Sequence, residues 1–167
     1  MGVRRIDDFE IDEDIRHSER EWRIERAGWI VMALVTVAAI LGLLGNGPLS
    51  ARSARDAAGI LTVHYDRFER AHAKSELRFE IGAPAASRGP LQVWIDRRYL
   101  DGIRLVSMDP EPERFEVSSD RVIYTYSAAG SPVSINIDCE FEECGSHLGR
   151  AGIPGGPEVA WNQFAYP

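Results

Sequence analysis

The feature that most constrains this chain is an apolar run from Ala27 to Leu44. No charged residue occurs between Arg26 and Arg52. The eighteen residues of the run would extend about 27 Å as a helix, close to the roughly 30 Å hydrocarbon core of a bilayer. A helix buried in a globular core would normally keep a polar face, and this run has none. The sequence therefore predicts a transmembrane helix, which we place at residues 19–47.

The segment before the run predicts a flexible tail followed by the start of the helix. Residues 1–18 mix charges of both signs with few apolar side chains, and such a segment cannot bury enough surface to fold. Ser18 and Glu21 fit a capping box, in which each side chain accepts a hydrogen bond from the other residue's backbone amide. We therefore expect the helix to begin near Glu19.

The segment after the run predicts a turn and a connector. Gly and Pro at residues 45–48 favour a helix stop, and residues 48–58 follow as a connector with at most one helical turn. The remaining residues, 59–167, are long enough for one domain. Small residues at 49–54 leave signal-peptide cleavage as an alternative. However, the apolar run exceeds the usual 7–15 residues of a signal peptide, which favours an uncleaved signal anchor.

The arginines around the run predict its orientation. Four of them closely precede it and two follow it: Arg16, Arg20, Arg23 and Arg26, then Arg52 and Arg55. The positive-inside rule therefore places the N-terminus in the cytoplasm and the domain outside. Within the run, Ala38 and Gly42 form a pair of small residues that would let a second membrane helix approach closely.

From residue 59 onward the apolar pattern changes to a period of two, which is typical of strands with one solvated face. Turn signals such as Asp101-Gly102 separate the short runs. We predict a mainly β fold: an immunoglobulin-like antiparallel β-sandwich with a helical turn at Asp96–Leu100. The expected strands are Ile60–Phe68, Ser75–Ile81, Leu91–Ile95, Ile103–Leu105, Phe115–Val117, Arg121–Ser127, Val133–Phe141, His147–Ile153 and Glu158–Tyr166.

The two cysteines, Cys139 and Cys144, are the sharpest candidates for chemistry. In an oxidising compartment outside the membrane they could form a disulfide across a turn. Unpaired thiols, buried or exposed, are one alternative. A metal or redox site made of Cys139, Cys144 and His147 is another, since copper(I) favours thiolates.

Aromatic residues supply a second set of candidates. Trp94 is opposite in phase to its apolar neighbours, while Trp161, Phe164 and Tyr166 gather near the C-terminus. Some of these four residues must close the core. The others would form an apolar contact patch for a neighbouring membrane protein.

Several turn and strand-edge motifs resemble a family of small bacterial single-pass membrane proteins. The motifs lie at Trp94–Gly102, Met108–Pro112, Gly155–Val159 and Gln163–Pro167, together with the Gly-Pro-Leu-Ser segment at Gly47–Ser50. The resemblance implies an outer β-sandwich on a single span of the bacterial inner membrane. It also implies a membrane-protein partner of the YetF-like, multi-span type, but it transfers no functional residues.

No motif in the sequence predicts catalysis. We find no phosphate loop, HExxH pair, dinucleotide fingerprint or nucleophile elbow, so we predict no cofactor and no enzymatic activity. The net charge of −7, with no basic face, argues against nucleic acid as a partner. We therefore expect a membrane-anchored accessory or binding subunit that contacts a membrane protein. The alternative is a periplasmic metal-binding or thiol-redox protein that uses Cys139 and Cys144.

Overall fold

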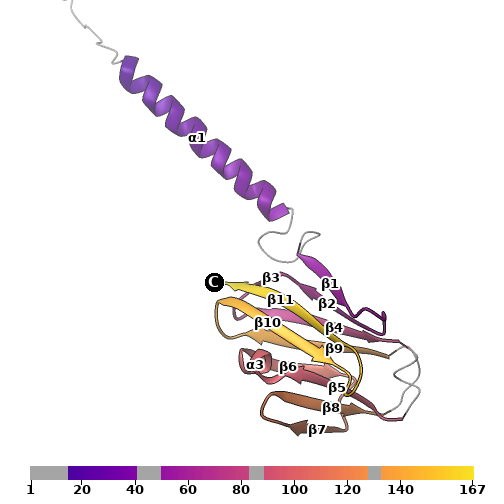
Figure 1. The fold of residues 1–167 in the computed structure, drawn as a ribbon. Helices are drawn as coiled ribbons and strands as arrows, with labels where there is room; N and C mark the ends of the chain where they lie inside the picture. The colour runs from indigo at the N-terminus through magenta and orange to yellow at the C-terminus, as the bar shows by residue number, and fades with distance from the viewer. Residues whose placement is uncertain (1–14, 41–49, 83–88, 128–132) are drawn as a thin grey trace, which may run out of the picture. The chain divides into compact units, whose positions relative to one another are not determined.

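A computed structural model describes residues 15–40, 50–82, 89–127 and 133–167, with side chains from residue 22 onward. The chain divides into two compact units, Met1–Val37 and Ala38–Pro167. The first unit is built on a helix and the second on two β-sheets (Figure 1). The prediction of a mainly β chain with one N-terminal helix is therefore confirmed.

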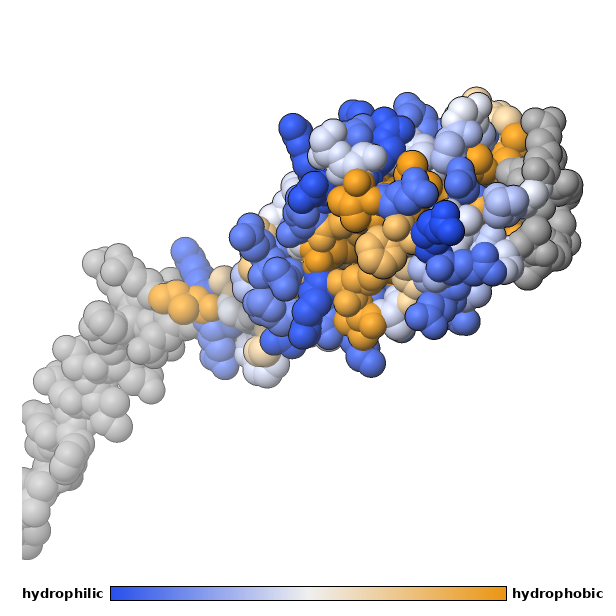
Figure 2. Space-filling model, turned by 90° about the horizontal axis from the view of Figure 1, so that it is seen from below, coloured by the Kyte–Doolittle hydropathy of each residue, from blue (hydrophilic) through white to orange (hydrophobic). Residues whose placement is uncertain are grey.

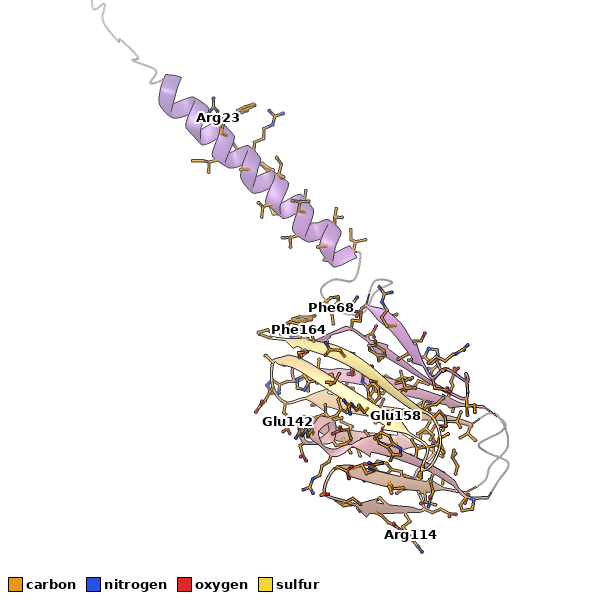
Figure 3. All side chains as sticks on the ribbon, in the orientation of Figure 1. Arg23, Phe68, Arg114, Glu142, Glu158 and Phe164 are labelled. Atoms are coloured by element: carbon orange, nitrogen blue, oxygen red, sulfur yellow. The ribbon has the colours of Figure 1, made fainter. Side chains whose placement is uncertain are left out.

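The helix of the first unit is α1 (Ile15–Ile40), which begins four residues before the predicted start at Glu19. Its large apolar side chains between Trp22 and Ile40 are exposed, and they project from several sides of the helix (Figure 3). Near its start, the guanidinium of Arg26 lies 4.5 Å from the centre of the Trp22 ring.

The described part of the chain contains no helix that is both long enough and apolar enough to span a bilayer. Arg23, Glu25 and Arg26 lie in α1, so its apolar part is confined to residues 27–40. The remaining four residues of the predicted apolar run, together with the predicted turn at 45–48, lie outside the described residues. The predicted span at 19–47 is thus not a feature of the described helix.

The second unit arranges its described strands in two sheets (Figure 1). One sheet has the order β1-β2-β4-β9-β6, and the other has the order β3-β11-β10-β5-β8-β7. The strands of the first sheet are β1 (Ala51–Arg55), β2 (Leu61–Asp66), β4 (Lys74–Ile81), β6 (Ile103–Asp109) and β9 (Val133–Phe141). Those of the second are β3 (Phe68–Arg70), β5 (Leu91–Asp96), β7 (Arg114–Val117), β8 (Arg121–Tyr126), β10 (Gly145–Gly152) and β11 (Glu158–Tyr166).

The predicted alternation is present in the longest strands. Residues of β4, β9 and β11 are buried at every second position, so each strand turns one face toward the other sheet. Aromatic rings join the two layers: the Phe79 ring of β4 meets the Trp161 ring of β11 edge-on, with 5.9 Å between centroids. Neighbouring strands pair antiparallel, except that β3 runs parallel to β11. The prediction of purely antiparallel pairing was wrong at this pair.

Two predictions about the start of the domain were also wrong. Residues 51–55 form a strand, β1, rather than a connector, because they pair with β2 along their whole length. The predicted strand Ile60–Phe68 breaks at Arg67 into β2 and β3, which belong to different sheets. Ser50 stabilises the break: its hydroxyl accepts a hydrogen bond from the Phe68 amide, and its carbonyl accepts one from the Arg67 amide.

The predicted helical turn is confirmed as α3 (Arg97–Asp101). Asp96 caps it, because its carboxylate accepts a hydrogen bond from the Arg98 amide at 2.8 Å. The turn carries Tyr99 into the core, where its ring lies 5.2 Å from that of Trp161.

Gly149 in β10 makes room for Trp161, its cross-strand partner in β11. A Cβ atom at this position would lie 2.2 Å from the Cε2 atom of the indole. Because Trp161 is buried, it cannot swing away without opening the core.

We therefore expect Gly149→Ala to lower the free energy of unfolding of the β-domain by about 3 kcal/mol, as overpacking does in other cores. Denaturant unfolding followed by tryptophan fluorescence measures the change. Gly28→Ala is the control, because no atom lies within 4 Å of a Cβ at that position. An unchanged midpoint for Gly149→Ala would contradict the packing described here.

Candidate functional site

The candidate site is a groove of about 870 Å³ between β6 and β7, the edge strands of the two sheets. Leu105, Val106 and Met108 line it from β6, and Phe115 lines it from β7. Figure 2 views the domain from the side of β7, where apolar residues gather within a hydrophilic surround. Contiguous exposed apolar surfaces are candidates for interaction sites.

The groove is a continuation of the hydrophobic core. Phe115 pairs with Tyr124 and Val117 pairs with Val122, so all four side chains lie on the same face of their sheet. Tyr124 and Val122 are buried, yet Phe115 is 64% exposed. The hydroxyl of Tyr126 in β8 donates a hydrogen bond to the sulfur of Met108 in β6 at 3.7 Å.

The contact between β8 and β6 explains this exposure. β7 lies beyond β8 in its sheet, whereas β6 is the outermost described strand of the other sheet. No described strand therefore covers the inner face of β7.

A bulge in β6 adds to the apolar lining. The pairing of β6 with β9 shifts register between Leu105 and Ser107. Leu105 and Val106 are adjacent, and both line the groove. Such bulges reorient side chains and are common beside functional sites.

Charged residues lie at the rim of the groove. Residues 109–116, from the last residue of β6 into β7, carry four carboxylates and one guanidinium, of which Glu111, Glu113 and Arg114 line the groove. Arg114 projects outward from the start of β7 (Figure 3). All five charged side chains are exposed: Asp109, Glu111, Glu113, Arg114 and Glu116. The groove thus combines an apolar floor with a charged border in which carboxylates outnumber the one guanidinium.

Sequence reasoning missed this site. The strand at Phe115–Val117 was predicted, and its alternation marks these residues as inward-facing, which suggests burial. Their exposure depends on how many strands the opposite sheet contains, and local periodicity carries no such signal. The run of acids at residues 109–116 was the only available hint.

The predicted cysteine site is not assembled. Cys139 points into the core from β9, while Cys144 is exposed on the turn before β10, and both thiols are free. Burial raises the pKa of the Cys139 thiol to about 12, so it holds its proton at neutral pH. The two thiols are not joined in this structure, and the disulfide stays a prediction.

The predicted metal site is not assembled either. His147 lies in β10, where its ring packs 4.8 Å from that of Phe141 and its Nε2 is 3.0 Å from the Glu143 carbonyl oxygen. Within the described ranges, no three His, Cys, Asp or Glu side chains are grouped so that they could hold a metal ion. Cys139, Cys144 and His147 do not form a common site.

Of the four aromatic candidates, the two tryptophans close the domain. Trp161 is buried between the sheets, and Trp94 is buried on the outer face under the Arg121 guanidinium, 4.8 Å from its ring centre. Neither is available for a partner, which corrects that part of the prediction. Phe164 is exposed and Tyr166 is half-buried, both in β11.

The small residues predicted to let a second membrane helix approach are only partly described. Ala38 is half-buried in α1, and Gly42 lies outside the described residues.

A buried polar cluster lies between β3, β4 and β9 and was also not predicted. Glu69 is only 3% exposed, and its carboxylate accepts a hydrogen bond from the Ser75 hydroxyl at 2.6 Å. Burial raises the pKa of Glu69 to about 7; the Ser75 hydrogen bond opposes this shift and the charge of Asp66 adds to it. Because the carboxyl group is buried, its protonation state bears on the stability of the domain.

The raised pKa of Glu69 should make the stability of the domain depend on pH. Its carboxyl group titrates near 4.5 when unfolded and near 7 when folded, so between these values only the folded protein holds the proton. The resulting stabilisation is complete below the unfolded pKa and is lost as the pH rises through about 7. Glu69→Gln keeps an acceptor for Ser75 but does not titrate.

We therefore expect the wild type to lose stability relative to Glu69→Gln as the pH is raised from about 5 to about 8. Urea unfolding of both proteins at several pH values measures the difference. Parallel stability curves for the two proteins would show that this carboxyl group titrates normally.

Comparison with known proteins adds no relative. No family model, no curated protein and no solved structure matches this chain. The resemblance to small bacterial single-pass membrane proteins, and the YetF-like partner that it implies, stay predictions.

Proposed function

We propose that this chain is a membrane-anchored accessory subunit whose β-domain lies outside the cytoplasm and binds a membrane-protein partner through the groove. The observation that carries the proposal is the groove itself, where inward-phase residues such as Phe115 are left uncovered. An apolar surface with a charged border matches the general plan of a protein-protein interface, with an apolar centre and a polar rim.

The anchor is proposed from the sequence together with the surface of α1. The apolar run continues past Ile40 to Leu44, which gives it the length of a bilayer span. Apolar side chains of α1 are exposed on several sides, so the helix lacks the polar face of an ordinary surface helix. The flanking arginines favour a cytoplasmic N-terminus in a bacterial inner membrane.

The immunoglobulin-like description of the two sheets belongs to the same proposal. Strands that are distant in sequence, such as β4 and β9, lie side by side, and the hydrophobic core lies between the two layers. Such sandwiches commonly serve as binding scaffolds, although the fold alone does not establish a function. The metal or thiol-redox alternative has no supporting observation in the described residues, because Cys139 is buried and protonated.

The free thiol of Cys144 provides a test of the topology. We expect a membrane-impermeant maleimide to label intact spheroplasts at Cys144, because this thiol is exposed and Cys139 is buried. Gel-shift detection of the chain measures the labelling, and Cys144→Ser is the control that should abolish it. Labelling only after lysis would reverse the proposed orientation. Labelling only after reduction would instead support the disulfide.

The binding role is tested by site-specific photocrosslinking. We expect p-benzoylphenylalanine at position 115, replacing a natural Phe, to form a light-dependent adduct with a multi-span membrane protein in intact membranes. Position 148 is the matched control, since Leu148 is 57% exposed but lies in β10, away from the groove. Mass spectrometry of the adduct identifies the partner. Equal adducts at both positions, or none at position 115, would overturn the proposal.

A further inference from the structure

The two sheets of the domain differ in their number of described strands, and the unmatched strand lies at the groove. The sheet that ends in β6 has five described strands, while the sheet that ends in β7 has six. β6 lies opposite β8, as the contact between Met108 and Tyr126 shows. The position opposite β7 would be filled by one more strand beside β6.

The free edge of β6 can receive such a strand. β6 pairs with β9 along one edge, and no described strand pairs with the other. An exposed edge presents unpaired backbone N–H and C=O groups, which are a template for another strand. An added strand would place alternate side chains into the groove. There they would cover Phe115 and Val117, both largely exposed.

Charge restricts the sequence of the incoming strand. Asp109 is the last residue of β6, and Glu111, Glu113 and Arg114 follow it and line the groove. The three carboxylates outnumber Arg114 at this end of β6, so the end of an incoming strand that lies beside Asp109 meets a negative field. Arginine or lysine at that end of the incoming strand would complement this field. Acidic residues there would be repelled.

We propose that the groove binds one extended segment of a partner protein, which adds to β6 as a sixth strand. The segment has apolar residues at alternate positions and a basic residue at the end that lies beside Asp109, and it matches the seven residues of β6 in length. Main-chain hydrogen bonds to β6 supply affinity, and the apolar side chains packed on Phe115 supply register. This inference rests on the proposed partner-binding function and specifies how the same site binds.

The probe is a fluorescent seven-residue peptide with valine at alternate positions, threonine between them and arginine at both ends. Its binding to the full-length chain in mild detergent is measured by fluorescence anisotropy. We expect saturable binding that weakens at least tenfold for Phe115→Asp. The matched control Leu148→Asp should bind as the wild type does, because this residue lies outside the groove.

Two altered peptides separate the parts of the proposal. Replacing both arginines by glutamate should weaken binding at least tenfold, and so should N-methylation of the amides on one edge of the peptide. Hydrogen exchange should show protection of residues 103–109 when the arginine peptide binds. Equal affinity for the glutamate peptide would overturn the charge argument, and equal affinity for the N-methylated peptide would overturn strand addition. No binding of the arginine peptide would overturn the whole inference.

A second copy of the chain is the main competing occupant. If sedimentation shows a dimer that Phe115→Asp dissociates, the groove is a self-association surface and the inference is wrong. The outcomes also separate this inference from the proposed function. A crosslinked membrane protein at position 115 with failed peptide binding rejects strand addition only, whereas no adduct at position 115 rejects the partner-binding role itself.

Discussion

The arrangement of the two sheets depends on one buried amide, that of Gln163 in β11. Its Oε1 accepts hydrogen bonds from the Tyr99 hydroxyl at 2.7 Å and from the Trp161 indole at 3.0 Å. Its Nε2 donates to the Asp66 carbonyl at the end of β2, also at 3.0 Å. A buried polar group that loses its partner costs about 1–3 kcal/mol, so the amide holds α3 and one strand of each sheet in fixed relation.

This network makes the part of the domain around Gln163 physically different from the part at β6 and β7. Around Gln163 the aromatic rings interlock and the polar groups satisfy one another, which leaves little freedom for rearrangement. At β6 and β7 the sheets end unevenly, and the core reaches the surface through Leu105 and Phe115. Because the hydrogen bonds and rings around Gln163 stabilise the fold there, the domain can expose apolar surface at β6 and β7 and still fold.

The predictable parts of this structure are those that local periodicity determines. The alternation of β4, β9 and β11 located the core faces, and it placed Cys139 inward as observed. β1 was missed because its sequence, Ala-Arg-Ser-Ala-Arg, has no apolar alternation and becomes a strand only through its pairing with β2. Gln163 sits at an inward position as a polar residue, and its role depends on partners far away in the chain. The groove depends on strand order, which no local pattern encodes.

The parallel pairing of β3 with β11 has a consequence for how the domain is made. β11 lies between β3 and β10, so β3 has no neighbour in its sheet until β11 is in place. The residues that meet, such as Phe68 and Phe164, are separated by most of the domain. Closing so long a loop costs chain entropy before any stabilising contact forms. Folds dominated by pairings between distant residues therefore assemble slowly. During synthesis, therefore, β3 stays unpaired while β1, β2 and β4 can already pair, and the sheet of six described strands is completed only after β11 has been made.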